Sequence, residues 1–532
     1  MVAEAAAQGT LRKHSPASGE LIAELPLTQP DDVPALVAKA RAAQQAWGRQ
    51  SARQRGKALV RISQVVASRA DELAELIARE TGKPKFEALF HEVFSVADLA
   101  RYFGKRLPKI LKPKKIPLHL LKHRQSTIHY VPRGVIGVIG PWNYPFTIVF
   151  GDVLMALAGG NGVVVKPSEH TPVIARECRR IVEAAGVDPE LVQVAIGHGD
   201  VGAALVNSDV DMMHFTGSVA TGRKISEACG KRLIPCVLEL GGKDAAVVLE
   251  DADVDRAAKQ IVWGAFANSG QICASVERVY AVGSVYEPLV SRMRALAEAL
   301  RQGHGGHDEA DVGPMITSEQ LDIVRSQVTE AVADGAKLET GGYDANGYYA
   351  PTILTDVDPQ MRVCREETFG PVVSVTRVDS TDTAVERAND SPYGLSAYVF
   401  TRNAQRGREV AQRLEAGSVL VNDLLANHAM PETPWGGVKL SGIGHTHGDD
   451  GLRHMCEARH INESRLPAFA PPWLFPYRSG MVGPTVDIMQ GLYGSETLFK
   501  RAQRLVGGFM RAFKAYRSDA SSPDHAASGE RH

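Results

Sequence analysis

The run Val135-Ile136-Gly137-Val138-Ile139 opens the part of the sequence that decides the fold. Longer stretches with helical spacing separate it from four further short apolar runs, at 162–165, 192–196, 212–215 and 237–240. Short apolar strands that alternate with helices are typical of βαβ units, in which a parallel sheet is buried on both faces. The region between residues 134 and 240 is therefore predicted to be an α/β domain.

The same alternation resumes after Lys243 and predicts a second α/β domain. The expected elements are a strand at 245–249, a helix at 254–267, a strand at 278–282 and a helix at 287–301. At 532 residues the chain is too long for one core, and two or three domains are expected.

Composition and charge describe an ordinary globular enzyme. Hydrophobic residues make up 44% of the chain and the formal net charge is -1, so no attraction to nucleic acid is expected. The six cysteines show no C-x-x-C spacing, which argues against a metal site or disulfide framework and for a reducing compartment. Because we find no secretory signal and no apolar run long enough to span a bilayer, we expect a cytoplasmic protein.

Two fragments carry the parts of a covalent catalyst. Cys273 ends the small-residue turn N-S-G-Q-I-C at 268–273, and Glu239 lies in L-E-L-G-G at 238–242. A thiolate can attack an electrophilic carbon, and a carboxylate can later activate water. Each residue also has a plainer interpretation, as a cysteine of the core or as a strand-end glutamate in a salt bridge. A buried carboxylate is nevertheless costly to keep without a purpose.

Seven motifs follow one another along the chain. They are P-W-N-Y-P at 141–145, K-P-S-E at 166–169, F-T-G-S-V-A-T-G at 215–222, E-L-G-G-K at 239–243, G-Q-I-C at 270–273, E-E-T-F-G-P at 366–371 and P-W-G-G-V-K-L-S-G at 434–442. In this order they resemble the aldehyde dehydrogenase superfamily, and the similarity runs from about His14 to Ile461.

The resemblance implies two parallel-sheet α/β domains and an arm that bridges subunits. A Rossmann-like NAD-binding domain would comprise 1–112 and 133–241, a catalytic domain 242–454, bridging segments 113–132 and 455–465, and a C-terminal extension 466–532. Because the family is usually dimeric or tetrameric, we expect a homodimer or a homotetramer.

By the same resemblance, three residues carry the chemistry. Cys273 would be the nucleophile, Asn143 would donate a hydrogen bond to the oxyanion, and Glu239 would be the general base that activates water. Relatives that transfer the acyl group to coenzyme A generally lack this glutamate, so its presence favours the non-acylating type, which releases a free acid. Asn143 could instead cap a helix that starts near Pro145.

The resemblance also implies a nicotinamide cofactor. Gly217 and Ser218 open a predicted helix whose N-terminus can face a pyrophosphate, although the pair could serve only as an N-cap. Glu169 would bind ribose hydroxyls and repel a 2′-phosphate, which favours NAD over NADP, or it could be a solvated charge at a helix entry. The remaining expected cofactor residues are Trp142, Lys166, Ser168, Gly199, Phe215, Leu240, Glu367 and Phe369.

Departures from the family pattern bear on the substrate. Gly151 stands where many relatives carry Trp and where succinate-semialdehyde enzymes carry Arg, and the loop 423–431 is apolar at several positions. These features favour an apolar aldehyde of medium or greater length, or an aromatic one. The expected substrate tunnel is formed by Ile148, Gly151, Ile272, Leu425 and Trp435. The alternatives are a succinate-semialdehyde dehydrogenase and, from another class, a catalytically silent relative, which would lack a residue such as Cys273.

The C-terminal extension contains one amphipathic helix. Apolar residues between Leu498 and Phe513 recur on one helical face, and most basic residues lie opposite. A basic amphipathic helix at 496–517 can contact an anionic membrane peripherally, or it can dock on its own domain or on a partner subunit. The sequence alone favours docking on protein.

Overall fold

The computed structural model describes residues 9–303, 310–345, 347–466, 474–475, 477 and 479–518. The chain forms two compact units. Unit 1 comprises Met1–Lys114 and Ile128–His460, and unit 2 comprises Lys115–Thr127 and Ile461–His532.

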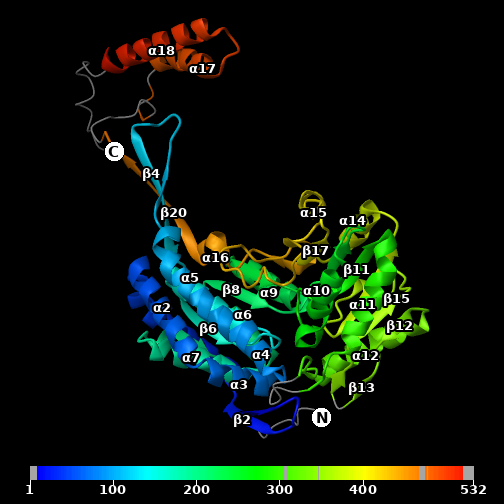
Figure 1. Cartoon of the computed structure of the whole chain (residues 1–532). Coiled ribbons are helices and arrows are strands. Elements are labelled where there is room, and N and C mark those ends of the chain that lie inside the picture. The colour runs from blue at the N-terminus through cyan, green and yellow to red at the C-terminus, as the bar shows by residue number, and fades with distance from the viewer. Residues whose placement is uncertain are drawn as a thin grey trace. The chain divides into compact units, whose positions relative to one another are not determined.

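The first half of unit 1 is built around a six-stranded sheet (Figure 1). Its order is β19 (Gly442–Ile443), β9 (Cys236–Glu239), β8 (Met212–Thr216), β5 (Val135–Ile139), β6 (Gly162–Lys166) and β7 (Val192–Val194). Five strands run parallel, and β19 pairs antiparallel with β9. The five apolar runs of the sequence are these parallel strands, which confirms the predicted α/β sheet.

Helices cover both faces of this sheet because its side chains alternate between two apolar cores. On β5, Ile136 and Val138 pack on one side and Val135 packs on the other. The first core includes α2 (Ala52–Ser68), α3 (Ala70–Thr81), α5 (Ser95–Ile110), α6 (Thr147–Gly159) and α7 (Pro172–Ala184). The second includes α1 (Val33–Gly48), α8 (Gly199–Asn207) and α9 (Val219–Arg232). Every residue of α6 except Ile148 is buried, so this helix lies in the interior.

A seven-stranded sheet forms the second half of unit 1. Its order is β12 (Lys337–Thr340), β15 (Thr352–Thr355), β16 (Val372–Val378), β11 (Val276–Val282), β10 (Asp244–Val248), β17 (Ser396–Phe400) and β18 (Ser418–Val421). Only the edge strand β12 is antiparallel to its neighbour. The helices of this half are α10 (Val254–Phe266), α11 (Tyr286–Glu298), α12 (Ser318–Ala333), α13 (Arg362–Arg365), α14 (Thr381–Asn389) and α15 (Ala404–Ala411).

Several short elements complete unit 1. They are the hairpins β1 (Thr10–His14) with β2 (Leu21–Pro26) and β13 (Asp344–Ala345) with β14 (Tyr348–Tyr349), together with α4 (Lys85–Glu87), the π-helical turn η2 (Ala88–Phe94), the turn η4 (Ala267–Gly270) and α16 (Gly448–His454). A further sheet has the order β20 (Cys456–Ser464), β4 (Arg124–Pro132) and β3 (Lys114–Ile116), and the chain passes between the units through these strands.

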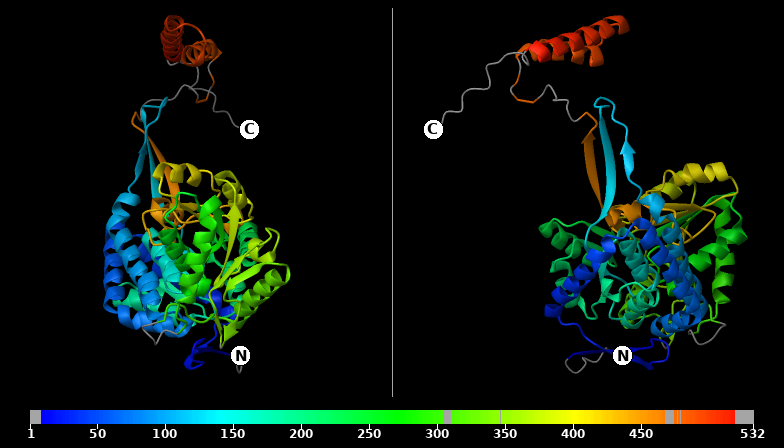
Figure 2. Two further views of the ribbon diagram at one scale, coloured as in Figure 1. Left: turned by 45° about the vertical axis from the view of Figure 1, so that its right-hand side comes forward. Right: turned by 90° about the vertical axis from the view of Figure 1, so that its left-hand side faces the viewer.

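Unit 2 contains two helices, α17 (Val482–Tyr493) and α18 (Leu498–Ser518), which lie side by side in Figure 2. Helix α18 is the predicted amphipathic helix, whereas α17 was not predicted because Gly483, Pro484 and Gly491 interrupt its apolar pattern. The small residues have a packing role: a Cβ on Gly491 would lie 2.8 Å from the backbone nitrogen of Leu505 on α18. Across the described ranges, no helix is long and apolar enough to cross a membrane.

Candidate active site

The expected catalytic residues meet at one edge of the six-stranded sheet. Asn143 follows the carboxyl end of β5, and Glu239 ends β9; because β9, β8 and β5 are parallel neighbours, these ends lie at the same edge. Cys273 enters from the other half of unit 1, where the chain leaves α10 through η4. Loops at the carboxyl ends of parallel strands are the usual place for ligands in α/β proteins.

The turn that presents Cys273 is strained. Asn268 and Ser269 adopt left-handed backbone angles, with φ values of 49° and 57°, and Gly270 follows with 69°. Non-glycine residues disfavour this conformation, so surrounding contacts must hold it. Glu87 accepts from the Asn268 backbone N–H at 2.6 Å. A Cβ on Gly270 would lie 2.1 Å from the Gly370 carbonyl oxygen, so this position accepts only glycine without a shift of the neighbouring backbone.

Asn143 is fixed by contacts that the sequence did not reveal. Its side-chain nitrogen donates to the Gln271 carbonyl at 2.9 Å, and its own carbonyl accepts from the Lys83 ammonium at 2.7 Å. Lys83 is also paired with Glu92 at 2.6 Å, and both side chains are almost fully buried. Helix α6 begins only at Thr147 without a side-chain cap, so Asn143 does not cap it. The amide nitrogen has a second N–H, which no described hydrogen bond uses.

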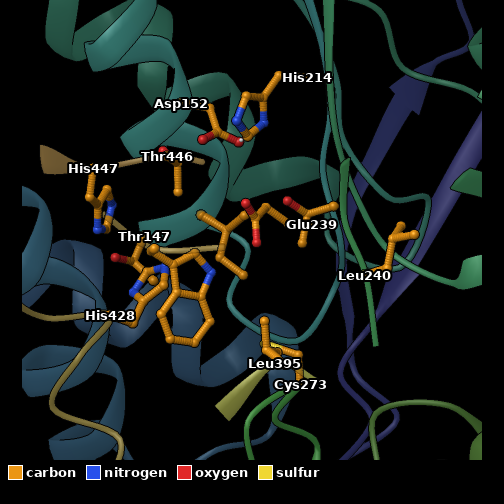
Figure 3. Close-up of a pocket in the computed structure, with 13 residues that line it drawn as sticks. Thr147, Asp152, His214, Glu239, Leu240, Cys273, Leu395, His428, Thr446 and His447 are labelled. Atoms are coloured by element: carbon orange, nitrogen blue, oxygen red, sulfur yellow. Dashed lines mark ion pairs between the residues drawn. The ribbon is translucent and has the colours of Figure 1, made fainter. Parts of the chain in front are cut away.

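Cys273 and Glu239 line one small pocket (Figure 3). Two expected tunnel residues, Ile148 and Trp435, line it with them, as does Leu240. Ile272 and Leu425 pack in the apolar cluster that contains Cys273, although they are not among the residues that line the pocket. Gly151 lies elsewhere on α6, where an added Cβ would contact the Leu99 side chain of α5 at 3.5 Å.

Burial disfavours charge on both reactive groups. Burial raises the pKa of the Cys273 thiol, and nearby carboxyl groups, of which Glu367 contributes most, raise it further. Burial also raises the pKa of Glu239 well above its ordinary value, Asp152 adds to this rise, and the neighbouring Trp435 indole opposes it. Neither Glu239 oxygen has a hydrogen-bond partner among the described residues. A buried carboxyl group without a partner is unusual for a structural residue, and it suits a base that must bind water.

The sequence did not single out five polar residues that line the same pocket. They are Asp152, His214, His428, Thr446 and His447. The signal that could have found two of them was a single polar residue inside an apolar run: Asp152 lies in buried α6, and His214 lies in buried β8.

The expected cofactor residues lie along the same sheet edge. Lys166 ends β6, and its ammonium lies 3.3 Å from the Glu169 carboxylate. Burial favours a raised pKa for Glu169, but nearby groups, Lys166 foremost, outweigh it and lower the pKa, so the carboxylate is charged at neutral pH. Ser168 is buried beside them, and Gly199 begins α8.

The N-terminus of α9 also faces this edge. Ser218 caps the helix by accepting from the Thr221 backbone N–H at 3.3 Å, so the capping interpretation is confirmed for this residue. Gly217 precedes it, and an added Cβ there would lie 2.6 Å from the Phe215 ring. A long helix whose N-terminus follows a glycine at the end of a parallel strand can accept a phosphate.

Glu367 and Phe369 come from the chain between α13 and β16. Glu367 is partly buried, accepts from the Gly242 backbone N–H at 3.0 Å, and has a pKa raised to about 8 by burial first and by Glu277 second. The Phe369 ring packs edge-on against Trp142 with centroids 5.3 Å apart. This segment is anchored by Glu277, which accepts from the backbone of Thr368 and Phe369.

These residues fit a dinucleotide. A helix N-terminus, an ionised carboxylate at the end of β6, and a partly buried carboxyl group beside an aromatic pair provide donors and acceptors for a pyrophosphate and two riboses. Lys166 ends β6, and Glu169 follows it by three residues. The two paired side chains can therefore contact the vicinal hydroxyls of one ribose.

Comparisons with known proteins agree with this geometry. A sequence model described as the aldehyde dehydrogenase family matches residues 3–461. The chain is 35% identical over 499 residues, 93% of each chain, to a protein of Methylomonas sp. named 4,4'-diapolycopene aldehyde oxidase. It is 36% identical over 86% of its length, and 89% of the relative's, to a protein of Mycolicibacterium smegmatis provisionally named succinate-semialdehyde dehydrogenase (NADP+).

Solved structures share the fold over most of the chain. An aldehyde dehydrogenase of Mycobacterium tuberculosis complexed with NAD+ superposes with a TM-score of 0.82 at 31% identity, covering 86% of this chain and 95% of that one. The NAD-dependent aldehyde dehydrogenase of Sinorhizobium meliloti gives 0.83 at 32% identity, covering 89% and 95%. The chain therefore belongs to the aldehyde dehydrogenase family and is an oxidoreductase that acts on aldehydes.

Proposed function

We propose that the protein oxidises an apolar aldehyde to the free carboxylic acid with NAD, by way of a thioester on Cys273. The observation that carries this proposal is the meeting of a cysteine and a buried carboxyl group without a partner in one pocket. A carboxyl group in this position is what hydrolysis of a thioester requires.

In the first step, the Cys273 thiolate would attack the aldehyde carbon and form a thiohemiacetal. The resulting alkoxide would accept from the uncommitted N–H of Asn143, which the Gln271 and Lys83 contacts hold in place. One such donor lowers the barrier by ~3 kcal/mol in related chemistry. NAD, when bound, supplies the acceptor for the hydride that leaves the substrate carbon.

In the second step, Glu239 would take a proton from water as the water oxygen attacks the thioester carbon. Collapse of that intermediate breaks the carbon–sulfur bond, returns the electron pair to Cys273 and releases the acid. Glu239 must be ionised for this step. Its raised pKa makes the ionised group a stronger base toward water than an ordinary carboxylate.

The preference for NAD over NADP rests on Glu169. Its carboxylate is ionised and partly exposed, so it can accept from ribose hydroxyls and would repel a 2′-phosphate. The mycobacterial relative is named for NADP, whereas the tuberculosis structure holds NAD+, so relatives do not decide this point. Kinetics with both cofactors test it: NAD should give the higher kcat/KM, and Glu169→Ser should narrow the difference.

Two observations support a long apolar substrate. Ile148, Leu395 and Trp435 give the pocket apolar walls. The Methylomonas relative, named for a polyene aldehyde, matches 93% of the 532 residues, which cannot fit within the 461 residues that the family model reaches. Its similarity to this chain therefore continues into unit 2. The C-terminal extension thus also occurs in a relative that is named for such a substrate.

A panel of aldehydes, scored by NADH absorbance, tests the substrate. We expect kcat/KM to rise along a series from hexanal to dodecanal and to be high for a polyene aldehyde such as retinal. Each methylene buried contributes ~0.8 kcal/mol at most, or roughly fourfold. If succinate semialdehyde is preferred to all of these, the second candidate, named in the mycobacterial relatives, is correct.

For unit 2, we infer attachment to an anionic membrane surface. The outer faces of α17 and α18 expose large apolar side chains, among them Met489 at 56%, Phe499 at 80% and Met510 at 68%. Residues 479–518 also contain six basic and two acidic side chains, which is the charge that anionic lipid attracts. The six free cysteines support a cytoplasmic location, and docking on protein, which the sequence alone favours, is the alternative outcome of the test below.

We further propose that subunits associate as a homodimer or homotetramer through 113–132 and 455–465. Light scattering of the purified protein measures the number of subunits directly.

Within unit 1, the two separate sheets support the proposed division into a cofactor domain that ends at residue 241 and a catalytic domain that begins at residue 242.

A further inference from the structure

A group of buried polar atoms without protein partners gathers at one side of the pocket. They include both oxygens of Glu239, Nε2 of His214, Oγ1 of Thr446 and Nδ1 of His447. The side chains come from three separate parts of the chain, and each is at most 5% exposed. Figure 3 shows them around a common space with Asp152.

Asp152 and His214 form a pair within this group. The carboxylate Oδ2 lies 3.0 Å from Nδ1 of the imidazole, and both side chains are almost fully buried. This distance suits an ion pair, although the angles do not make a hydrogen bond. Nε2 of His214 has no hydrogen-bond partner among the described residues, so it can bond to water.

Water is the remaining source of hydrogen bonds for these atoms. Buried polar groups in folded proteins are almost always hydrogen-bonded, to protein or to ordered water. The enclosed part of the pocket has room for about one water molecule, which could contact two or more of the five unpartnered atoms. Such a water would connect the Glu239 carboxyl group to the imidazole of His214.

We propose that Asp152 and His214 accept, through water in this chamber, the proton that Glu239 removes from the hydrolytic water. The inference rests on the proposed function, because it concerns the fate of a proton that thioester hydrolysis must release. Asp152 and His214 are positioning residues in this scheme, since they act through water and Glu239 and do not touch the thioester.

The proton balance of the relay is simple. After hydrolysis, Glu239 is a neutral carboxylic acid and must lose its proton before the next turnover. The proton passes through water to Nε2 of His214 and forms an imidazolium that is paired with the Asp152 carboxylate. That imidazolium then loses the proton to solvent, and no oxidant or reductant is involved.

The pair also couples electrostatically to Glu239. The Asp152 charge raises the pKa of Glu239, so a proton on His214, which offsets that charge, favours ionisation of Glu239. The other titratable groups around the chamber are Cys273, His428, His447 and Cys236. Burial lowers the pKa of His428 to about 4 and that of His447 well below its ordinary value, so both are neutral near pH 7.

Two variants test the relay, His214→Gln and Asp152→Asn, which retain polarity and approximate size. With a good aldehyde, each should keep a burst of about one NADH per active site, while steady-state kcat falls ~100-fold, at the lower end of the ~100–10,000-fold range for proton transfer. His454→Gln is the matched control: His454 also has an unpartnered buried Nδ1 but does not line the chamber, and kcat should be unchanged.

The pH profile separates a relay from a general loss of structure. Asp152→Asn removes the charge that raises the pKa of Glu239, so the acid limb of kcat should move to lower pH while the plateau falls. A variant with only a structural defect would lose burst amplitude and leave the limb where it was. Unchanged kcat in folded His214→Gln overturns the proposal.

The unaltered protein provides a test that does not depend on folding of the variants. A high-resolution crystal structure of the NAD complex should show ordered water that links Glu239 to Nε2 of His214, and a dry chamber overturns the relay. If the unaltered enzyme oxidises aldehydes and the chamber is dry, only the relay fails. If no aldehyde of the panel yields NADH, the proposed function fails with it.

Discussion

In the proposed mechanism Cys273 and Glu239 react as anions, and their surroundings disfavour both anions. Burial is the main cause for each pKa rise, and the carboxyl groups around them add to it. A charge on one group therefore opposes a charge on the other. The pair suits an enzyme in which the two residues act in succession, because acylation needs the thiolate and hydrolysis needs the carboxylate.

This division predicts different defects for two substitutions. Cys273→Ala should abolish aldehyde oxidation while NAD still binds, because only the nucleophile is lost. Glu239→Gln should retain a single burst of NADH and then stop, because acylation precedes the step that needs the base. Stopped-flow absorbance distinguishes the two, and Cys364→Ala, a cysteine outside the pocket, should behave like the unaltered enzyme. Full steady-state turnover by Glu239→Gln would remove this residue from its role.

The raised pKa values also predict the pH dependence. A base acts only when deprotonated, so the raised pKa of Glu239 moves the acid limb of kcat above the range of an ordinary carboxyl group. We expect kcat to fall as the pH drops through this raised pKa; because burial lowers the pKa of His428 to about 4, His428 is not the source of the limb. Measurement of kcat across a constant-ionic-strength buffer series checks this, and a profile that is flat above about pH 5 would contradict it.

At the scale of elements, the π-helical turn η2 contacts and holds the loop that begins α6 at the candidate active site. Glu92 within it accepts from the Phe146 backbone N–H at 2.8 Å and from the Lys83 ammonium, which also donates to the Asn143 carbonyl. Interruptions of this kind inside helices are frequent at functional sites. Here the turn lets one buried ion pair hold the loop that carries Asn143, the proposed oxyanion donor.

Replacement of the buried cation should therefore affect stability and catalysis together. Lys83→Met leaves the Glu92 carboxylate buried without its partner, which costs ~3–5 kcal/mol of unfolding free energy in comparable pairs. Lys85→Met, two residues away, removes a more exposed lysine that pairs with Asp71, and should cost less than ~1 kcal/mol. Urea unfolding followed by circular dichroism measures both, and equal midpoints for the two variants would contradict the expected role of Lys83.

The elements that could be predicted from sequence were those whose side chains share one environment. Strand β5 is apolar throughout because helices cover both of its faces, and its bounds match the apolar run. The polar groups of the pocket could not be predicted, because His214 and Asp152 are far apart in the chain and meet only through the packing of α6 on the sheet. The contact between Lys83 and Asn143 likewise exists only in three dimensions. Motif order located Cys273, Glu239 and Asn143, but not the residues that tune them.

At the scale of the whole molecule, the α17–α18 pair carries the proposed membrane-binding surface. Its helices pack through Gly491 and Gly508, and Arg504 and Arg511 pair with Asp487 of α17. These ion pairs join the two helices to each other. The outward faces of the pair expose the large apolar side chains. An exposed surface of this kind in a soluble protein marks an interaction site.

Removal of the residues after Leu466 should therefore abolish membrane binding and leave the enzyme folded. The intact protein should sediment with phosphatidylserine vesicles, less with neutral vesicles, and less again in high salt, because charges are screened within about 10 Å at roughly 0.1 M. The double substitution of Phe509 and Phe513 by Ser should weaken binding without a change in thermal stability. Loss of stability or a changed oligomeric state on truncation, without vesicle binding by the intact chain, would establish docking on protein.

The antiparallel pairing of β19 with β9 has a consequence for synthesis of the chain. Strand β9, which ends at the general base, remains an open edge until Gly442–Ile443 arrives, about 200 residues later. At ~5–20 residues per second, the ribosome needs roughly 10–40 s to supply that partner. During this interval Leu240 lacks the Ser441 carbonyl to which its backbone N–H later donates, and the edge can pair wrongly with another chain. Nascent chains stalled before residue 442 should thus be the species that chaperones must protect.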